Sequence, residues 1–143
     1  LEIGSRIIDH TADITIECWA PTLEQAYSEA ARAAFEVILD TSTVEPRVPV
    51  EVEVHGIDLK ELLVEWIGRL IALIDINYHF YSKFEVQTIL PDEDGLVLRG
   101  VVWGEDIDHN KHVTRTEVKA MTYANMAIDV GLNRTTLRFT LDL

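Results

Sequence analysis

The sequence of 143 residues contains one cysteine and no long apolar run, and each absence excludes a class of protein. Because Cys18 has no partner for an internal disulfide, a reducing, cytoplasmic location is favoured over a secreted one. No apolar stretch approaches the ~20 residues that a membrane-spanning helix needs. The first residues also lack the basic and apolar segments of a signal peptide. We therefore expect no membrane association.

Basic residues are scarce as well. The chain has 12 lysines and arginines against 25 aspartates and glutamates, a net charge of −13, and its basic residues are scattered along the sequence. An acidic chain without a basic cluster repels phosphate backbones, so we expect no direct nucleic-acid binding. A basic protein partner or a divalent cation is favoured instead, although acidity could also serve solubility alone.

The common enzyme motifs are missing too. The sequence has no glycine-rich phosphate loop, no serine in a Gly-x-Ser-x-Gly setting, and Cys18 falls at an inward strand position. His109 and His112 lie beside Glu105 and Asp106 and could form a transition-metal cluster, but the segment is typical of a solvated loop and has no cysteine nearby. These absences predict that the protein is not an enzyme on its own.

What the sequence does contain indicates an α+β protein with a real core, since 48% of its residues are apolar. Helix-start signals at Thr22 and Asp58 precede two segments with helical spacing, the first running to about Leu39. Alternating or β-rich segments predict strands over residues 13–19, 50–55, 84–90, 96–103, 117–123, 125–130 and 134–143. We expect one domain over residues 1–143, with a largely antiparallel mixed sheet of about six to eight strands and two main helices.

Two aspartates stand at the ends of strands and are turned away from the core. Side chains in a strand alternate faces, so Asp13 lies opposite the buried set Ile14, Ile16 and Cys18. The last strand places Asp142 opposite Leu137, Phe139 and Leu141 in the same way. If the two ends of the chain meet at a sheet edge, the two carboxylates could bind a hard cation.

The polar cluster around the first of these aspartates allows two interpretations. Asp9-His10-Thr11-Ala12-Asp13 could form a turn in which Asp9 or Thr11 hydrogen-bonds to local backbone amides. Alternatively, Asp13 acts with the chain end Asp142-Leu143, which offers a side-chain carboxylate and an α-carboxylate. Three such groups repel one another unless a cation such as Ca²⁺, Mg²⁺ or Mn²⁺ neutralises them.

Several blocks of the sequence together resemble the archease family, in order and over nearly the whole chain. Two blocks together are specific to this family: the aspartate-histidine cluster of residues 9–13 and a later block, Glu117-Val118-Lys119-Ala120-Met121-Thr122-Tyr123. Further likeness lies in both helix starts, in two short dipeptides and in the acidic-aliphatic ending. These are Thr22-Leu23-Glu24-Gln25-Ala26-Tyr27 and Asp58-Leu59-Lys60-Glu61-Leu62-Leu63-Val64-Glu65-Trp66, then Gly104-Glu105 and Lys111-His112, and finally Asp142-Leu143.

The resemblance implies an archease-like fold and an accessory factor for the RtcB-type RNA ligase of tRNA splicing and RNA repair. Such factors accelerate guanylylation of the ligase by GTP and support multiple turnover, using a bound divalent ion that could pass to the ligase. Carried over, the metal ligands are Asp13, Asp142 and the terminal Leu143, with calcium the expected ion and magnesium or manganese the alternatives. A chaperone-like binding module whose metal is only structural is the alternative function.

The resemblance also implies supporting residues. His10, with Asp9, is expected to orient a carboxylate rather than to bind a hard ion directly. Lys119 falls in a matched block and could contact the partner, or be an outward strand lysine. Many family members carry histidine where this chain has Ala124, and often an acid where it has Arg69, so neither position is assigned a role.

Overall fold

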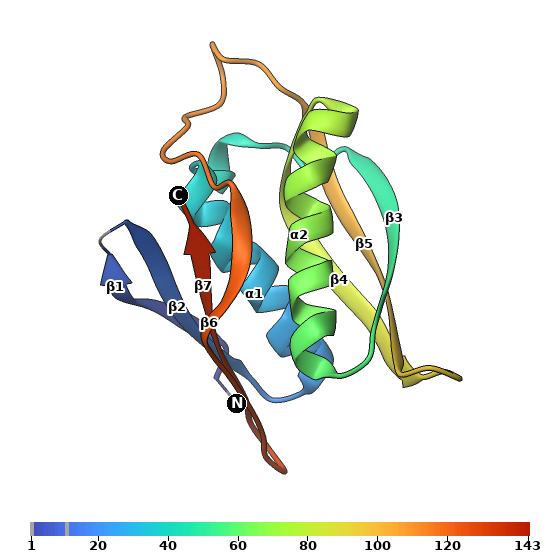
Figure 1. Cartoon of the computed structure of the whole chain (residues 1–143). Helices are drawn as coiled ribbons and strands as arrows, with labels where there is room; N and C mark the ends of the chain where they lie inside the picture. Colours follow the sequence, from blue (N-terminus) through green and yellow to red (C-terminus); the bar gives the residue numbers. More distant parts are fainter. Residues whose placement is uncertain (1, 11) are drawn as a thin grey trace.

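The computed structural model describes residues 2–10 and 12–143, and these residues form seven strands and two main helices (Figure 1). The α+β class is confirmed, but the strands make two antiparallel sheets instead of one mixed sheet. The first sheet has the order β1 (Gly4–His10), β2 (Asp13–Ala20), β7 (Thr135–Asp142), β6 (Ala120–Val130). The second has the order β3 (Val48–Gly56), β5 (Leu96–Asp106), β4 (His79–Pro91).

The two helices lie between the sheets and supply the core that joins them. Helix α1 (Leu23–Ile38) packs on β4 and β2, while helix α2 (Leu59–Asn77) packs on β6 and β3 (Figure 1). The side chains at the centre are fully buried, among them Ile16, Phe35, Trp66 and Phe139. Within the described residues, neither helix is long and apolar enough to cross a membrane.

Both predicted helix starts are confirmed at the level of hydrogen bonds. The backbone N–H of Gln25 donates to Thr22 Oγ1 at 3.1 Å, and that of Glu61 donates to Asp58 Oδ1 at 2.9 Å. Glu61 in turn accepts from the N–H of Ile57, which precedes the cap. These side chains satisfy N–H groups that the first helical turn leaves without partners, and they set where each helix begins.

The structure corrects the strand predictions at several points. Strand β1 was not expected, because it is an edge strand whose register shifts between Ile7 and Asp9 and whose apolar side chains are exposed. Strand β6 is continuous where two strands were expected: a left-handed residue, Asn125 at φ 56°, bulges it without ending it. Residues 117–119 lie outside that strand, and β4 begins at His79 rather than at residue 84.

Candidate metal site

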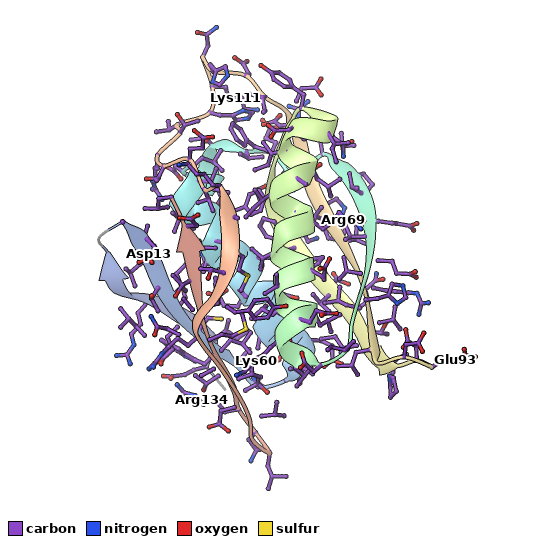
Figure 2. The ribbon with its side chains drawn as sticks, viewed as in Figure 1. Asp13, Lys60, Arg69, Glu93, Lys111 and Arg134 are labelled. Atoms are coloured by element: carbon purple, nitrogen blue, oxygen red, sulfur yellow. The ribbon has the colours of Figure 1, made fainter. Side chains whose placement is uncertain are left out.

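The end of the first sheet brings the two predicted aspartates together. Strand β2 begins with Asp13, strand β7 ends with Asp142, and the two residues are direct partners in the antiparallel register. Direct partners project from the same face of a sheet, so the two carboxylates are neighbours. Asp13 and the chain end lie at the same end of the sheet (Figures 1 and 2). The expectation that the first and last segments meet is confirmed.

Strands β2 and β7 are held together beside the two aspartates by a hydrogen bond between two threonines and by an ion pair. On the same face, Thr15 and Thr140 are buried and share a hydrogen bond of 2.9 Å between their Oγ1 atoms. The next rung pairs Glu17 with Arg138 at 3.2 Å, and Arg6 reaches Glu17 at 2.8 Å. The threonines stand two residues from each aspartate, so strand alternation alone places them on the aspartate face, although the sequence analysis did not single them out.

Charge compensation differs sharply between the two acidic rungs. Burial alone would raise the pKa of Glu17, but hydrogen bonds from Arg6 and Arg138 outweigh it and hold that pKa below its usual range. Neither Asp13 nor Asp142 forms an ion pair with any basic side chain that the structure describes. Two facing carboxylates without a basic partner are the oxygen donors that a hard cation prefers, so these residues fit such an ion.

A third strand holds Asp142 from its other side. Ala120 of β6 is the partner of Asp142, and the backbone N–H of Lys119 donates to the Asp142 carbonyl at 2.8 Å. The backbone of Lys119 is thus tied to the C-terminal residues, while its side chain is exposed. A role for Lys119 in contacting a partner stays a prediction.

The remaining candidate ligands have different standings. Leu143 directly follows Asp142 and is half-buried. The structure describes only the backbone of Asp9 and His10, not their side chains, so their supporting role stays a prediction. Across the described part of the chain, no three side chains of His, Cys, Asp or Glu are grouped to hold a metal ion. A complete ligand set around Asp13 and Asp142 therefore needs other oxygen atoms, such as a main-chain oxygen of Leu143.

Comparison with known proteins places this chain in a family. The model described as "Archease protein family (MTH1598/TM1083)" matches residues 6–143. The chain belongs to the archease family. The relative called protein archease in Sulfurisphaera tokodaii is 45% identical over 135 residues, covering 94% of this chain and 95% of the relative. The Methanopyrus kandleri protein archease is 41% identical over 136 residues, covering 95% and 96%.

Solved structures agree with the archease assignment. The solution structure of protein 1598 from Methanobacterium thermoautotrophicum is 35% identical, has a TM-score of 0.82, and the match covers 98% of this chain and 99% of that one. A crystal structure from Thermotoga maritima, described as an archease and possible chaperone, has a TM-score of 0.57 and covers 95% and 94%. At 17% identity, it shows the fold alone.

The histidine segment of this archease-family chain is a structural anchor. The segment is a loop, as expected from the sequence, but His112 is buried within it rather than solvated. Its Nδ1 accepts the N–H of Asp108 at 3.0 Å, so Nε2 carries the hydrogen and donates to Glu105 Oε2 at 2.9 Å. Both ring nitrogens are therefore occupied, and neither is free to bind zinc. His109 is exposed.

Glu105 collects the hydrogen bonds that anchor this segment. Burial alone would raise its pKa, but hydrogen bonds from His112, Lys111 and the backbone of Glu45 lower the pKa of Glu105 to about 2, from 4.5. Its carboxylate also lies 3.6 Å from Arg47 Nε. The sequence already places Glu105 near Lys111 and His112, but only the fold shows that Glu105 accepts hydrogen bonds from both.

Glu105→Gln is expected to remove an acid-labile part of the folding stability. Because the pKa of Glu105 is lower in the folded chain, its contribution is complete above pH 4.5 and is lost as pH falls toward 2. At pH 7 the variant should be less stable by about 2 kcal/mol, and the difference should shrink on acidification. Urea unfolding across this pH range measures it. Glu51→Gln, at an exposed residue, is the control, and a pH-independent difference would contradict the assignment.

Proposed function

We propose that this protein activates an RtcB-type RNA ligase and is not itself an enzyme. In this proposal it promotes guanylylation of the ligase by GTP and supports multiple turnover. The observation that carries the proposal is the pairing of Asp13 with Asp142 in a chain of the archease family. The resemblance of the 9–13 and 117–123 blocks to that family supplies the identity of the partner.

The proposed metal ligands are Asp13, Asp142 and the main-chain carboxylate of Leu143, taken as the C-terminal residue. A bound divalent ion supplies the positive charge that neutralises the two facing carboxylates, because no described basic side chain does so. Calcium suits an all-oxygen site with flexible geometry, and magnesium or manganese would use the same donors. The buried Thr15–Thr140 hydrogen bond and the Lys119 contact to Asp142 hold the two strands that present these oxygens.

The charge of the chain supports action on a protein rather than on RNA. With a net charge of −13, the protein repels a phosphate backbone and attracts a basic surface. Complementary charge accelerates the encounter of two proteins more than it tightens their complex. Stimulation of the ligase should therefore weaken as salt concentration rises, because exposed charges are screened over roughly 10 Å at 0.1 M ionic strength.

The direct test is labelling of a purified RtcB-type ligase with radiolabelled GTP, with and without this protein. Parallel reactions contain calcium, magnesium or manganese, and the yield of guanylylated ligase is followed over several turnovers. We expect a stimulation of at least tenfold with one of the ions and little with chelator. Equal labelling with and without the protein under every condition would remove the proposed function.

A chaperone-like binding module is the second candidate, favoured by exposed apolar side chains on an edge strand. Ile7 is 57% exposed and Ile8 is 45% exposed on β1, and such residues can bind unfolded chains. The Thermotoga maritima relative is described as a possible chaperone. Suppression of aggregation of a heat-denatured model protein, unaffected by chelator, would favour this candidate over ligase activation.

A further inference from the structure

A cavity of about 440 Å³ opens between the C-terminal end of α2 and residues 107–118. It belongs to neither the aspartate pair nor the Glu105 anchor. Its floor is apolar and comes from both helices, strand β4 and the segment that crosses over them, namely Ile38, Ile71, Ile74, Phe80, Ile107 and Val118. A concave apolar site of this size with a few polar groups at its rim is typical of a binding site.

The rim of this cavity carries negative charge that the protein does not compensate. Asp75 and Glu117 line the rim, and neither has an ion pair or side-chain hydrogen bond with a residue that the structure describes. Arg115 is the only lysine or arginine in the described lining, and it is bound to the Glu36 carboxylate at 3.0 Å and the Glu36 carbonyl at 2.8 Å. Arg115 is therefore committed to Glu36, and a lysine or arginine that faces Asp75 and Glu117 has to come from a ligand.

The helix end beside the cavity adds to this preference. Helix α2 ends at Asn77, and its last turn contains no basic residue. The C-terminal end of a helix carries a partial negative charge, roughly −0.5 of an elementary charge, which favours a nearby cation. The rim carboxylates and the helix end thus both favour a cationic group at the mouth of a cavity whose floor is apolar.

The segment that walls the cavity is held in place before any ligand binds. The backbone N–H groups of Arg115 and Thr116 donate to the carbonyls of Ile38 and Val37 at the end of α1, at 2.8 and 3.2 Å. Asp40 N–H donates to the Val113 carbonyl at 2.8 Å on the same stretch. A wall fixed by several backbone hydrogen bonds is preorganised, which lowers the entropy lost on binding.

We propose that this cavity docks a basic and apolar segment of the protein partner. An apolar side chain of the segment fills the cavity, and an adjacent lysine or arginine faces Asp75 and Glu117. A protein segment fits better than a small molecule because the cavity opens onto exposed aromatic surface: Tyr78, which lines it, is 58% exposed. The proposal rests on the proposed function, because it takes the partner to be the ligase.

The position of the cavity suits a partner that also reaches the aspartate pair. The wall of residues 107–118 runs directly into Lys119, whose N–H binds the Asp142 carbonyl. Figure 1 shows this segment and the C-terminus at the same end of the molecule. One partner surface could therefore contact the cavity and the C-terminal aspartate together.

The first experiment measures the dissociation constant of the wild type and of the Asp75→Lys, Glu117→Lys double variant for a purified RtcB-type ligase. The Glu51→Lys, Glu85→Lys double variant, which makes the same total charge reversal at exposed residues outside the cavity, is the matched control. We expect the cavity double variant to bind at least tenfold more weakly and the control to change less than twofold. Wild-type affinity in a folded cavity double variant would overturn the docking proposal.

The second experiment separates this proposal from the proposed function, because it needs no ligase. The amide resonances of ¹⁵N-labelled protein are followed during titration with the peptide acetyl-Lys-Leu-Lys-amide. We expect saturable shifts confined to the cavity lining, with none from acetyl-Glu-Leu-Glu-amide. Lining shifts without ligase binding would support the cavity and overturn ligase activation. Identical responses to the two peptides, or shifts elsewhere only, would overturn the cavity.

Discussion

Replacing Asp13 or Asp142 by asparagine is expected to abolish stimulation of the ligase and to weaken divalent-ion binding by about 100-fold, since affinity in oxygen sites follows the number of charged ligands. The same change should make the metal-free protein slightly more stable. Like charges directly opposite in a sheet are destabilising by up to about 1 kcal/mol, and asparagine removes that repulsion without changing side-chain size. Calorimetric calcium titration and thermal unfolding in chelator measure the two effects.

The opposite signs of these effects distinguish a metal site from a merely structural pair. Glu17→Gln is the control, because Glu17 lies on the same face but is already compensated by Arg6 and Arg138. That variant should lose some stability and keep its ion affinity. If Asp13→Asn loses the ion but still activates the ligase, the metal is structural and the chaperone-like candidate gains. Unchanged ion affinity in both aspartate variants would remove the site itself.

Truncating Trp66 to alanine is expected to produce the largest loss of stability, about 3–5 kcal/mol. Trp66 is fully buried on α2, and its indole Nε1–H donates to the Tyr27 carbonyl of α1 at 3.0 Å. The hydroxyl of Tyr27 donates back to the Leu59 carbonyl at the start of α2. The substitution leaves a large cavity between the helices and breaks one of these two ties. Guanidinium unfolding followed by circular dichroism measures the loss.

A loss of this size is a substantial part of the total stability of a domain, which is about 5–15 kcal/mol. Trp66→Phe is the matched control, because it keeps an aromatic ring and removes the indole hydrogen bond. It should cost about 1–2 kcal/mol, counting the lost hydrogen bond and the smaller ring. If alanine costs no more than phenylalanine, packing between the two helices is not what joins the two sheets.

Local features of the fold could be predicted well from the sequence because they depend on neighbouring residues. Thr22 and Asp58 cap the helices as expected, since a cap needs only a side-chain oxygen and an N–H three residues later. The burial of Ile14, Ile16 and Cys18 followed from alternation alone. Strand β1 escaped prediction because an edge strand with a register shift and exposed apolar residues breaks that alternation.

Non-local features could not be predicted in this way. The division into two sheets depends on which strands pair, and pairing between distant segments is set by packing on α1 and α2. His112 looked like a solvated loop histidine because its neighbours are polar, but Glu105 of β5 and Phe80 of β4 reach it and bury it. The cavity beside α2 likewise needs residues from both helices and the crossing segment.

The sequence by itself determined the side of each strand on which Asp13 and Asp142 lie, because alternation within a strand is a property of the local backbone. It also determined an acidic chain with two capped helices. Only the tertiary structure decided that β7 lies between β2 and β6, and that placement makes the two aspartates direct partners. The reason is physical: closing a loop of almost the whole chain costs entropy that only the buried contacts of the complete core can offset.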